Sequence, residues 1–270
     1  MTAECAAVRP ANHESAIVLE VSNLKKAFGG LVAVQDCSLK LRRCEVTGLI
    51  GPNGAGKSTV LDLLSAVERP DEGRVLLAGR NIDRDSTEAR ARLGLVRTFQ
   101  DPRIWSRLTV LENVLVVGDA QTGFSGWGVI FRHRKAMAQQ NSHIRRAVEV
   151  LEAVELQHMM DRRAGELSGG QARLLAFARL AMANPAVILL DEPLAGINPV
   201  LAERLMDLIR SMASKGAAVL VVEHNLAAVE RTCDVVYVMS EGSVIGMGTM
   251  EELRRSQDVV DAYLGTVAGV

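Results

Sequence analysis

One nine-residue segment has the residue types and the spacing of a phosphate-binding loop. It matches the pattern G-x-x-x-x-G-K-[ST] and consists of Gly51, Pro52, Asn53, Gly54, Ala55, Gly56, Lys57, Ser58 and Thr59. The glycines let the backbone curl until successive N–H groups converge on phosphate oxygens. Lys57 can then reach the β- and γ-phosphates of a nucleotide, and the Ser58 hydroxyl suits Mg²⁺. A strand pattern before the segment and a helix pattern after it make an ordinary glycine turn the weaker interpretation.

A second glycine-containing segment begins another predicted helix far downstream. Ser168, Gly169, Gly170 and Gln171 follow Leu167 and lead into a long stretch with an apolar stripe. The start of a helix exposes backbone N–H groups and carries a partial positive charge, and both favour an anion. One chain therefore carries two segments that are suited to phosphate.

Two carboxylates come directly after an apolar strand pattern at 187–190. Asp191, at the carboxyl end of that strand, is expected to hold the Mg²⁺ shell. Glu192, one residue further, can lie beside an attacking water and orient or deprotonate it. A plain acidic strand end is the alternative, and the phosphate loop upstream favours the catalytic interpretation.

Two more polar residues, Gln100 and His224, stand at the ends of predicted strands. The Gln100 amide can contact metal or water. Through that contact, the presence of the γ-phosphate can affect the segment that follows Gln100. His224 is placed to bond a γ-phosphate oxygen, because ligands of such sheets bind outside the carboxyl ends of the strands. A surface glutamine and an ordinary loop histidine remain the alternatives that these residues leave open.

The elements that must position these residues alternate between strand and helix, which predicts a parallel α/β sheet. Strands are predicted at 17–21, 38–41, 46–50, 74–77, 95–99, 187–190, 217–222, 235–239 and 243–246. Helices are predicted at 57–66, 88–93, 109–117, 131–156, 200–212 and 227–231, and over the stretch after Ser168. Residues from about 100 to 183 therefore form an all-helical insertion in the series.

The composition indicates an aliphatic and nearly neutral protein. Hydrophobic residues make up 48% of the 270 residues and aromatic residues only 3%, so we expect an aliphatic core. The formal net charge of −1 argues against general nucleic-acid binding, which needs a basic face. The four cysteines lack zinc-ligand spacing, which predicts reduced thiols in a cytosolic protein. The apolar runs are much shorter than the roughly 20 residues that cross a bilayer, so work at a membrane would require a membrane-embedded partner.

In their order along the chain, these motifs resemble the nucleotide-binding subunit of ABC transporters. The resemblance covers about 17–265 and rests on the phosphate loop, Gln100, the LSGGQ segment 167–171, the strand 187–192, Asn198 and His224. LSGGQ is the signature of that family. The resemblance implies the α/β fold of P-loop NTPases, with a RecA-like parallel sheet core, an N-terminal antiparallel β subdomain and an inserted α-helical subdomain. It divides the chain into a flexible tail, 1–15, and one nucleotide-binding domain, 16–265, with its core at 16–99 and 184–265 and its helical subdomain at about 100–183.

The resemblance also implies how ATP and Mg²⁺ are bound. Phe28 matches the aromatic residue that stacks on adenine in the family. Two subunits pack head to tail, so that ATP on the Lys57 loop of one is capped by Ser168, Gly169, Gly170 and Gln171 of the other. Ser58, Gln100 and Asp191 then hold Mg²⁺, and Glu192, His224 and Gln100 act in hydrolysis.

Several segments resemble the larger ATPase subunit of branched-chain amino-acid importers. They are residues 97–100, 108–114, 195–199 and 262–265, together with the extra stretch 119–143. Asn225, Ala172 and Leu175 depart from the residues that are usual after the histidine and after LSGGQ. This resemblance implies hydrolysis of ATP that is coupled to uptake of branched-chain or other hydrophobic amino acids.

The resemblance further implies the partners of the chain. They are integral membrane permease subunits, a second ATPase subunit and, indirectly, an extracytoplasmic substrate-binding protein, with the chain peripheral on the cytoplasmic face of the membrane. The alternatives are a lipopolysaccharide-export or urea/amide ATPase of the same fold, or a soluble iron–sulfur assembly ATPase without a membrane partner. These residues do not specify the transported substrate. They also do not specify whether the two ATPase subunits of the dimer are identical or different.

Overall fold

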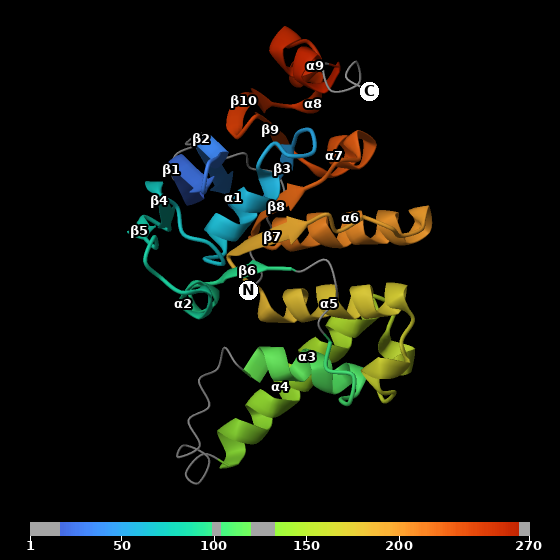
Figure 1. Ribbon diagram of the computed structural model, residues 1–270. Helices are drawn as coiled ribbons and strands as arrows, with labels where there is room; N and C mark the ends of the chain where they lie inside the picture. Colours follow the sequence, from blue (N-terminus) through green and yellow to red (C-terminus); the bar gives the residue numbers. More distant parts are fainter. Residues whose placement is uncertain (1–16, 99–103, 120–132, 265–270) are drawn as a thin grey trace. The chain divides into compact units, whose positions relative to one another are not determined.

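The computed structural model describes residues 17–98, 104–119 and 133–264, with the side chains of 118–119, 133–140 and 263–264 outside that description (Figure 1). Gln100 and most of the stretch 119–143 lie outside the described residues. The chain divides into two compact units. The first contains 1–100, 186–196 and 209–270, and the second contains 101–185 and 197–208.

Ten strands of the described residues form one mixed sheet in the first unit, in the order β5-β4-β1-β2-β10-β9-β3-β8-β7-β6. The strands are β1 (Ile17–Phe28), β2 (Leu31–Arg42), β3 (Glu45–Ile50), β4 (Glu72–Leu77), β5 (Arg80–Asn81), β6 (Leu95–Arg97), β7 (Val187–Asp191), β8 (Ala218–Val222), β9 (Val235–Ser240) and β10 (Ser243–Gly248). The five strands from β9 to β6 run parallel, whereas β1, β2 and β4 pair in antiparallel fashion.

The parallel strands that matter for the site end level with one another. Asp191 of β7 pairs with Val222 of β8, and Leu49 of β3 pairs with the same Val222. All five residues of β7 and all five of β8 are buried, as expected for parallel strands that are covered on both faces. Their near-continuous apolar runs made both strands predictable from the sequence.

The antiparallel hairpin β1–β2 is longer than the sequence predicted. The prediction covered only 17–21 and 38–41, whereas the strands meet in a turn at Gly29, which has a φ of 59°. Among residues 23–28 and 31–36, only Leu24 and Val34 are buried, so the outer parts of the two strands lack the regular alternation of a half-buried strand. Their own ladder of backbone hydrogen bonds carries the hairpin outward.

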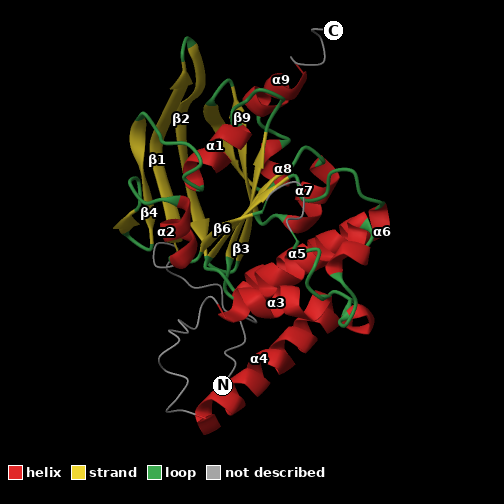
Figure 2. Cartoon of the chain, turned by 60° about the horizontal axis from the view of Figure 1, so that its bottom comes forward, coloured by secondary structure: helices red, strands yellow, loops and turns green. Residues whose placement is uncertain are grey.

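Helix α1 (Lys57–Leu64) lies between the antiparallel and the parallel strands (Figure 2). Its buried side chains share one core cluster with residues of β1, β2, β4, β7 and β8. The carboxyl end of α1 receives the buried guanidinium of Arg90, which belongs to α2 (Thr87–Arg92) and is 1% exposed. Arg90 Nη1 donates to the carbonyls of Leu63 and Leu64, both at 2.7 Å, and Nη2 donates to Ile82 O at 2.9 Å. A cation at this end also complements the helix dipole.

Three further helices complete the first unit. They are α7 (Leu226–Thr232), α8 (Met250–Leu253) and α9 (Gln257–Leu264). Apolar side chains of all three pack with Ile50 and with two valines of β9 in a second cluster. The sequence predicted α7 but not α8, α9 or β5, which are short and carry no long periodic pattern.

The second unit is helical. It contains α3 (Val110–Asp119), α4 (His133–Ala153), α5 (Gly169–Ala183) and the first part of α6 (Pro199–Ser214). The buried amide of Asn113 accepts from Trp105 N at 2.9 Å and donates to Trp105 O at 3.0 Å and to Thr109 O at 2.9 Å, which ties the segment before α3 to that helix. No helix within the described ranges is both long and apolar enough to cross a bilayer.

We expect the substitution Arg90→Met to destabilise the first unit, because it leaves three buried carbonyl groups without their donor. Leaving buried acceptors unsatisfied should lower the free energy of unfolding by at least about 2 kcal/mol, measured by urea denaturation. Arg92→Met is the matched control, because Arg92 is exposed on the same helix and should change stability by less than about 0.5 kcal/mol. Equal effects of the two substitutions would contradict a specific role for Arg90.

Candidate functional site

The phosphate loop joins the carboxyl end of β3 to the start of α1. A side chain at Gly51 would place Cβ 2.1 Å from Met239 O, and one at Gly56 would place it 2.4 Å from Ala33 O, so both positions require glycine. Gly56, at the capping position before α1, provides no side-chain cap, whereas α5 and α7 are each preceded by a residue whose side chain caps the helix. The uncapped N–H groups at the start of α1 are therefore suited to bind an anion.

Lys57 lies inside the loop that it follows. Its ammonium donates to Gly51 O at 2.7 Å and to Pro52 O at 2.8 Å. Burial lowers the pKa of Lys57, while the carboxylates of Glu192 and Asp191 act in the opposite direction. Ser58, the next residue, is exposed. The loop thus holds a cation and a hydroxyl at the start of one helix.

Asp191 is held by an arginine that the sequence analysis did not single out. Arg97 Nη2 lies 2.9 Å from Asp191 Oδ2, and its Nη1 lies 2.5 Å from Asp62 Oδ1 of α1. Arg97 and Asp191 are both largely buried, and Ser65 Oγ accepts a further hydrogen bond at 3.2 Å. One guanidinium therefore joins β6, β7 and the helix of the phosphate loop. The signal in the sequence was a lone charge at the end of a short apolar strand.

Glu192 and His224 come together from the ends of neighbouring strands. Glu192 Oε1 lies 3.7 Å from His224 Nδ1, and the His224 side chain is 62% exposed. Glu192 has a φ of 44°, a conformation that L-residues other than Asn and Asp rarely adopt, and its N–H donates to Val222 O at 3.0 Å. The arrangement places a carboxylate and an imidazole at the edge of the sheet where β3 delivers the phosphate loop.

Phe28 lies at the end of β1, with 45% of its surface exposed. The Lys26 ammonium lies 5.1 Å from the centre of the ring, within the range of a cation–π interaction. Lys26 is itself held by Arg69 O at 2.9 Å and by two carboxylates, Glu68 and Asp71, at 3.6 Å. The Phe28 ring is thus anchored by Lys26 while much of it stays accessible.

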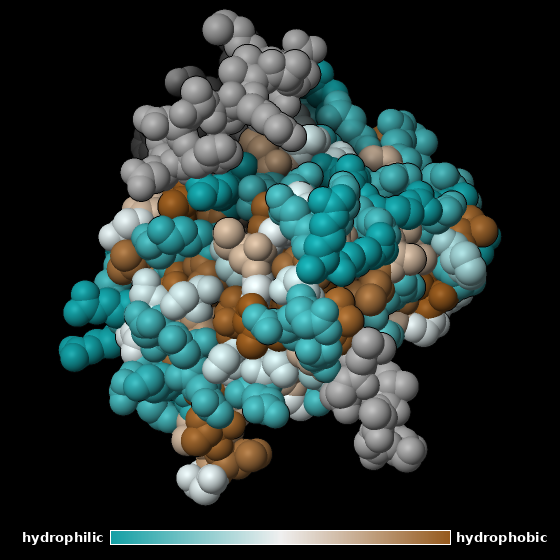
Figure 3. Space-filling model, turned by 90° about the horizontal axis from the view of Figure 1, so that it is seen from above, coloured by the Kyte–Doolittle hydropathy of each residue, from teal (hydrophilic) through white to brown (hydrophobic). Residues whose placement is uncertain are grey.

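Hydrophobic side chains also reach the surface elsewhere, in small groups among hydrophilic ones (Figure 3).

The signature segment begins α5 in the second unit. Ser168 Oγ accepts from Gln171 N at 3.3 Å, and Gln171 Oε1 accepts from Ser168 N at 2.9 Å, which forms a capping box. Space around Gly169 is open, whereas a side chain at Gly170 would meet Leu201 at 3.0 Å. The Ser168 hydroxyl uses its oxygen in the cap and keeps its proton to donate.

Two asparagines, the motif residue Asn198 and Asn225 directly after His224, act as helix caps. Asn198 Oδ1 accepts from Leu201 N at 2.9 Å at the start of α6. Asn225 Oδ1 accepts from Ala227 N at 3.1 Å and from Ala228 N at 3.2 Å at the start of α7. Asparagine and aspartate serve about equally well in this position, so the departure at Asn225 preserves the cap.

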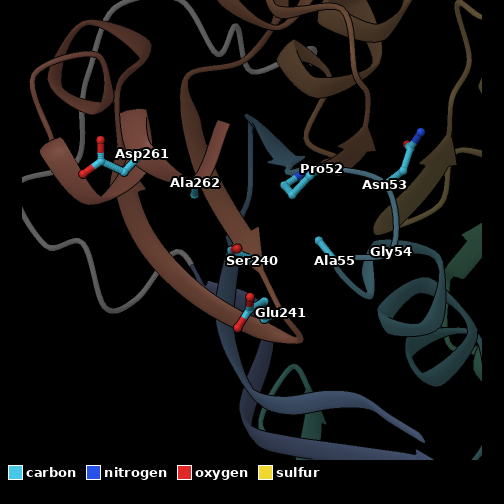
Figure 4. Close-up of a pocket in the computed structure, with 8 residues that line it drawn as sticks. All are labelled: Pro52, Asn53, Gly54, Ala55, Ser240, Glu241, Asp261 and Ala262. Carbon is cyan, nitrogen blue, oxygen red and sulfur yellow. The ribbon is translucent and has the colours of Figure 1, made fainter. Parts of the chain in front are cut away.

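A cavity of about 390 Å³ lies beside the phosphate loop (Figure 4). It is lined by Pro52, Asn53, Gly54, Ala55, Ser240, Glu241, Asp261 and Ala262. The two carboxylates would repel a phosphate, and neither Lys57 nor Ser58 contributes to the lining. The start of α1 is therefore better suited to a phosphate than this cavity is.

The donors near the loop suit Mg²⁺. The Ser58 hydroxyl and the Asp191 carboxylate are oxygen ligands, and Mg²⁺ is commonly bound by one or two carboxylates together with substrate phosphates. Within the described part of the chain, no cluster of three or more His, Cys, Asp or Glu side chains could hold a metal ion by itself. A site completed by nucleotide phosphates fits this donor set.

Comparisons with known proteins show the family of this chain. A family model described as "ABC transporter" matches residues 34–195. The chain is 39% identical to the high-affinity branched-chain amino acid transport ATP-binding protein LivG of Salmonella typhimurium, over 92% of this chain and 98% of the relative. It is 37% identical to the corresponding protein BraF of Pseudomonas aeruginosa, with the same coverage.

A solved structure shows the same fold. The ADP conformation of an ATP-binding cassette of an ABC transporter matches with a TM-score of 0.76 and 36% identity, over 92% of this chain and 99% of that one. The fold class and the family predicted from the sequence are thereby confirmed. The chain belongs to the ABC transporter family, as one of its ATPase subunits.

Proposed function

We propose that this chain is the ATP-hydrolysing subunit of an importer for branched-chain or other hydrophobic amino acids. One observation carries the proposal. The phosphate loop, with the uncapped start of α1, lies at the same edge of the sheet as Asp191, Glu192 and His224. The relatives named above are ATP-binding proteins of branched-chain amino acid transport, which supports the substrate class.

In this proposal each residue has a separate task. The N–H groups at the start of α1 and the Lys57 ammonium bind the β- and γ-phosphates of ATP, and Phe28 stacks on the adenine. Ser58, Gln100 and Asp191 hold Mg²⁺, which neutralises charge on the phosphate oxygens when bound. Glu192 orients and deprotonates the attacking water, and His224 donates to a γ-phosphate oxygen.

The second half of the site comes from another subunit. Ser168, Gly169 and Gly170 of the neighbouring ATPase subunit cover the γ-phosphate, with the Ser168 proton and the glycine N–H groups as donors. ATP thus becomes part of the interface, and its hydrolysis weakens that interface. Integral membrane permease subunits are the further partners, with an extracytoplasmic binding protein acting through them, and the chain works at the cytoplasmic face of the membrane.

One surface residue supports a membrane-protein partner. Trp105 is 43% exposed, and the Arg179 guanidinium lies 4.1 Å from its ring. A large, anchored aromatic residue is typical of the central contacts of protein interfaces.

A soluble iron–sulfur assembly ATPase is the competing function. Purification of the chain from membranes with permease subunits supports the importer, whereas cytosolic scaffold proteins alone would support the competitor.

The substitution Glu192→Gln should lower steady-state hydrolysis of ATP by about 10²–10⁴-fold, because the amide cannot act as the base. The variant should accumulate as an ATP-bound dimer, measured by light scattering after gel filtration. Glu149→Gln, an exposed carboxylate of α4, is the control. A wild-type rate in Glu192→Gln would contradict the assignment of the base.

A mixing experiment tests the shared site. Lys57→Ala and Ser168→Glu should each be inactive alone, since one lacks the phosphate contact and the other places a negative charge against the γ-phosphate. In a mixed dimer, the wild-type loop of one subunit faces the wild-type signature of the other, so mixing the two variants should restore part of the activity. Absence of any recovery, with dimers present, would contradict a site built from two chains.

The role of Asp191 can be tested without hydrolysis. Mg²⁺ should strengthen binding of ADP to the wild-type chain, and Asp191→Asn should reduce that gain by on the order of 10–100-fold, measured by calorimetry with Mg²⁺ and with EDTA. Asp62→Asn is the control, because Asp62 also contacts Arg97 but is assigned no metal contact. Equal gains in Asp191→Asn and wild type would refute the assignment.

A further inference from the structure

Glu223 is a buried carboxylate that lies outside the motifs described above. It directly follows β8 and is 2% exposed. Its Oε1 accepts from Leu194 N at 3.0 Å, and its Oε2 accepts from His224 N at 3.2 Å. One side chain therefore bonds to the backbone of two different segments, the loop after β7 and the loop after β8.

The bond to Leu194 N lies two residues after the strained residue Glu192 in the chain. The N–H of Glu192 donates to Val222 O at 3.0 Å, and the N–H of Ala195 donates back to Glu192 O at 3.1 Å. The Leu194 bond to Glu223 is the second tie between this turn and the end of β8. A residue held at a φ of 44° persists only where its surroundings fix it, and here the end of β8 supplies that constraint.

The chemistry of the bridge requires a carboxylate. Both bonded groups are N–H donors, and an ionised carboxylate offers two acceptor oxygens and no donor. A glutamine of the same shape offers only one acceptor, so one of the two N–H groups would face an NH₂ group. A neutral isostere therefore breaks one tie while it keeps the size of the side chain.

We infer that Glu223 is a positioning residue that fixes Glu192 and His224 relative to each other. Through its two backbone bonds it sets the 3.7 Å separation between Glu192 Oε1 and His224 Nδ1, and its own Oε2 lies 4.0 Å from that nitrogen. The inference rests on the proposed function, in which Glu192 orients the water and His224 contacts the γ-phosphate. Glu223 acts through these two residues and touches no substrate.

The test compares Glu223→Gln with Asp83→Asn in the full-length chain. Asp83 also accepts with both oxygens, from Val75 N at 2.6 Å and from Asn81 Nδ2 at 2.8 Å, but it lies next to β5 and away from the motif residues in the sheet order.

Glu223→Gln should lower kcat by at least about tenfold, because small misplacements of catalytic groups cost up to about 10²-fold. The KM for ATP and the affinity for ADP should stay within about twofold of wild type, since the phosphate loop is unchanged. Asp83→Asn should leave kcat unchanged.

A double-mutant cycle with His224→Ala separates positioning from general destabilisation. If Glu223 acts through His224 and Glu192, the loss caused by Glu223→Gln should shrink strongly once His224 is absent. Fully additive losses, or a wild-type kcat in Glu223→Gln while Glu192→Gln is inactive, would overturn the inference and leave the proposed function standing. A wild-type kcat in Glu192→Gln would instead overturn the proposed function and this inference with it.

Folding of the variant is checked by its Tm and by ADP binding. Should Glu223→Gln fail to bind ADP, Glu223→Asp replaces it, because aspartate keeps the charge but is one methylene too short to reach both N–H groups. The same kcat loss with normal ADP affinity in Glu223→Asp supports the inference, and a wild-type kcat there overturns it.

Discussion

The register of three buried parallel strands is the constraint on which the site depends. β3, β7 and β8 are paired so that Leu49 and Asp191 both lie opposite Val222. Because β7 and β8 are buried along their whole length, charged side chains can stand only at or beyond their ends. Shared register then brings those ends, and the phosphate loop after β3, to one edge of the sheet.

Each buried charge at that edge has a partner within the protein. Lys57 donates to two loop carbonyls, Asp191 faces Arg97, and Glu223 accepts from two backbone N–H groups. Unpaired charges in these positions would be strongly destabilising, so the partners let polar groups stay fixed where chemistry needs them. The left-handed backbone at Glu192 costs about 1–3 kcal/mol, which the bonds to Val222 and Glu223 help to offset. Fixed dipoles and charges are what electrostatic catalysis requires.

The sequence alone predicted the parts of this arrangement that are local. The spacing of the phosphate loop, the apolar runs of β7 and β8 and the helix stripes all lie within short windows, and the structure contains these elements. The outer hairpin, β5, α8 and α9 were missed, because short or half-polar segments carry no strong period. Arg97 was quoted only as part of a family resemblance, and its contact with Asp191, 94 residues away, has no signature in either segment. The roles of the individual site residues remain predictions.

The two helix starts to which the proposal gives phosphate contacts differ in their capping, and this difference suggests the order in which they meet a nucleotide. α1 begins without a side-chain cap, so its N–H groups have unmet hydrogen-bonding capacity that a nucleotide can satisfy. α5 begins with the Ser168–Gln171 capping box, which stabilises that helix by itself and leaves the open backbone at Gly169 and the Ser168 proton for an added contact. Nucleotide should therefore bind first at Lys57 of one subunit, and the signature of the other should close on an already bound triphosphate. In the proposed function, dimerisation is then a consequence of ATP binding.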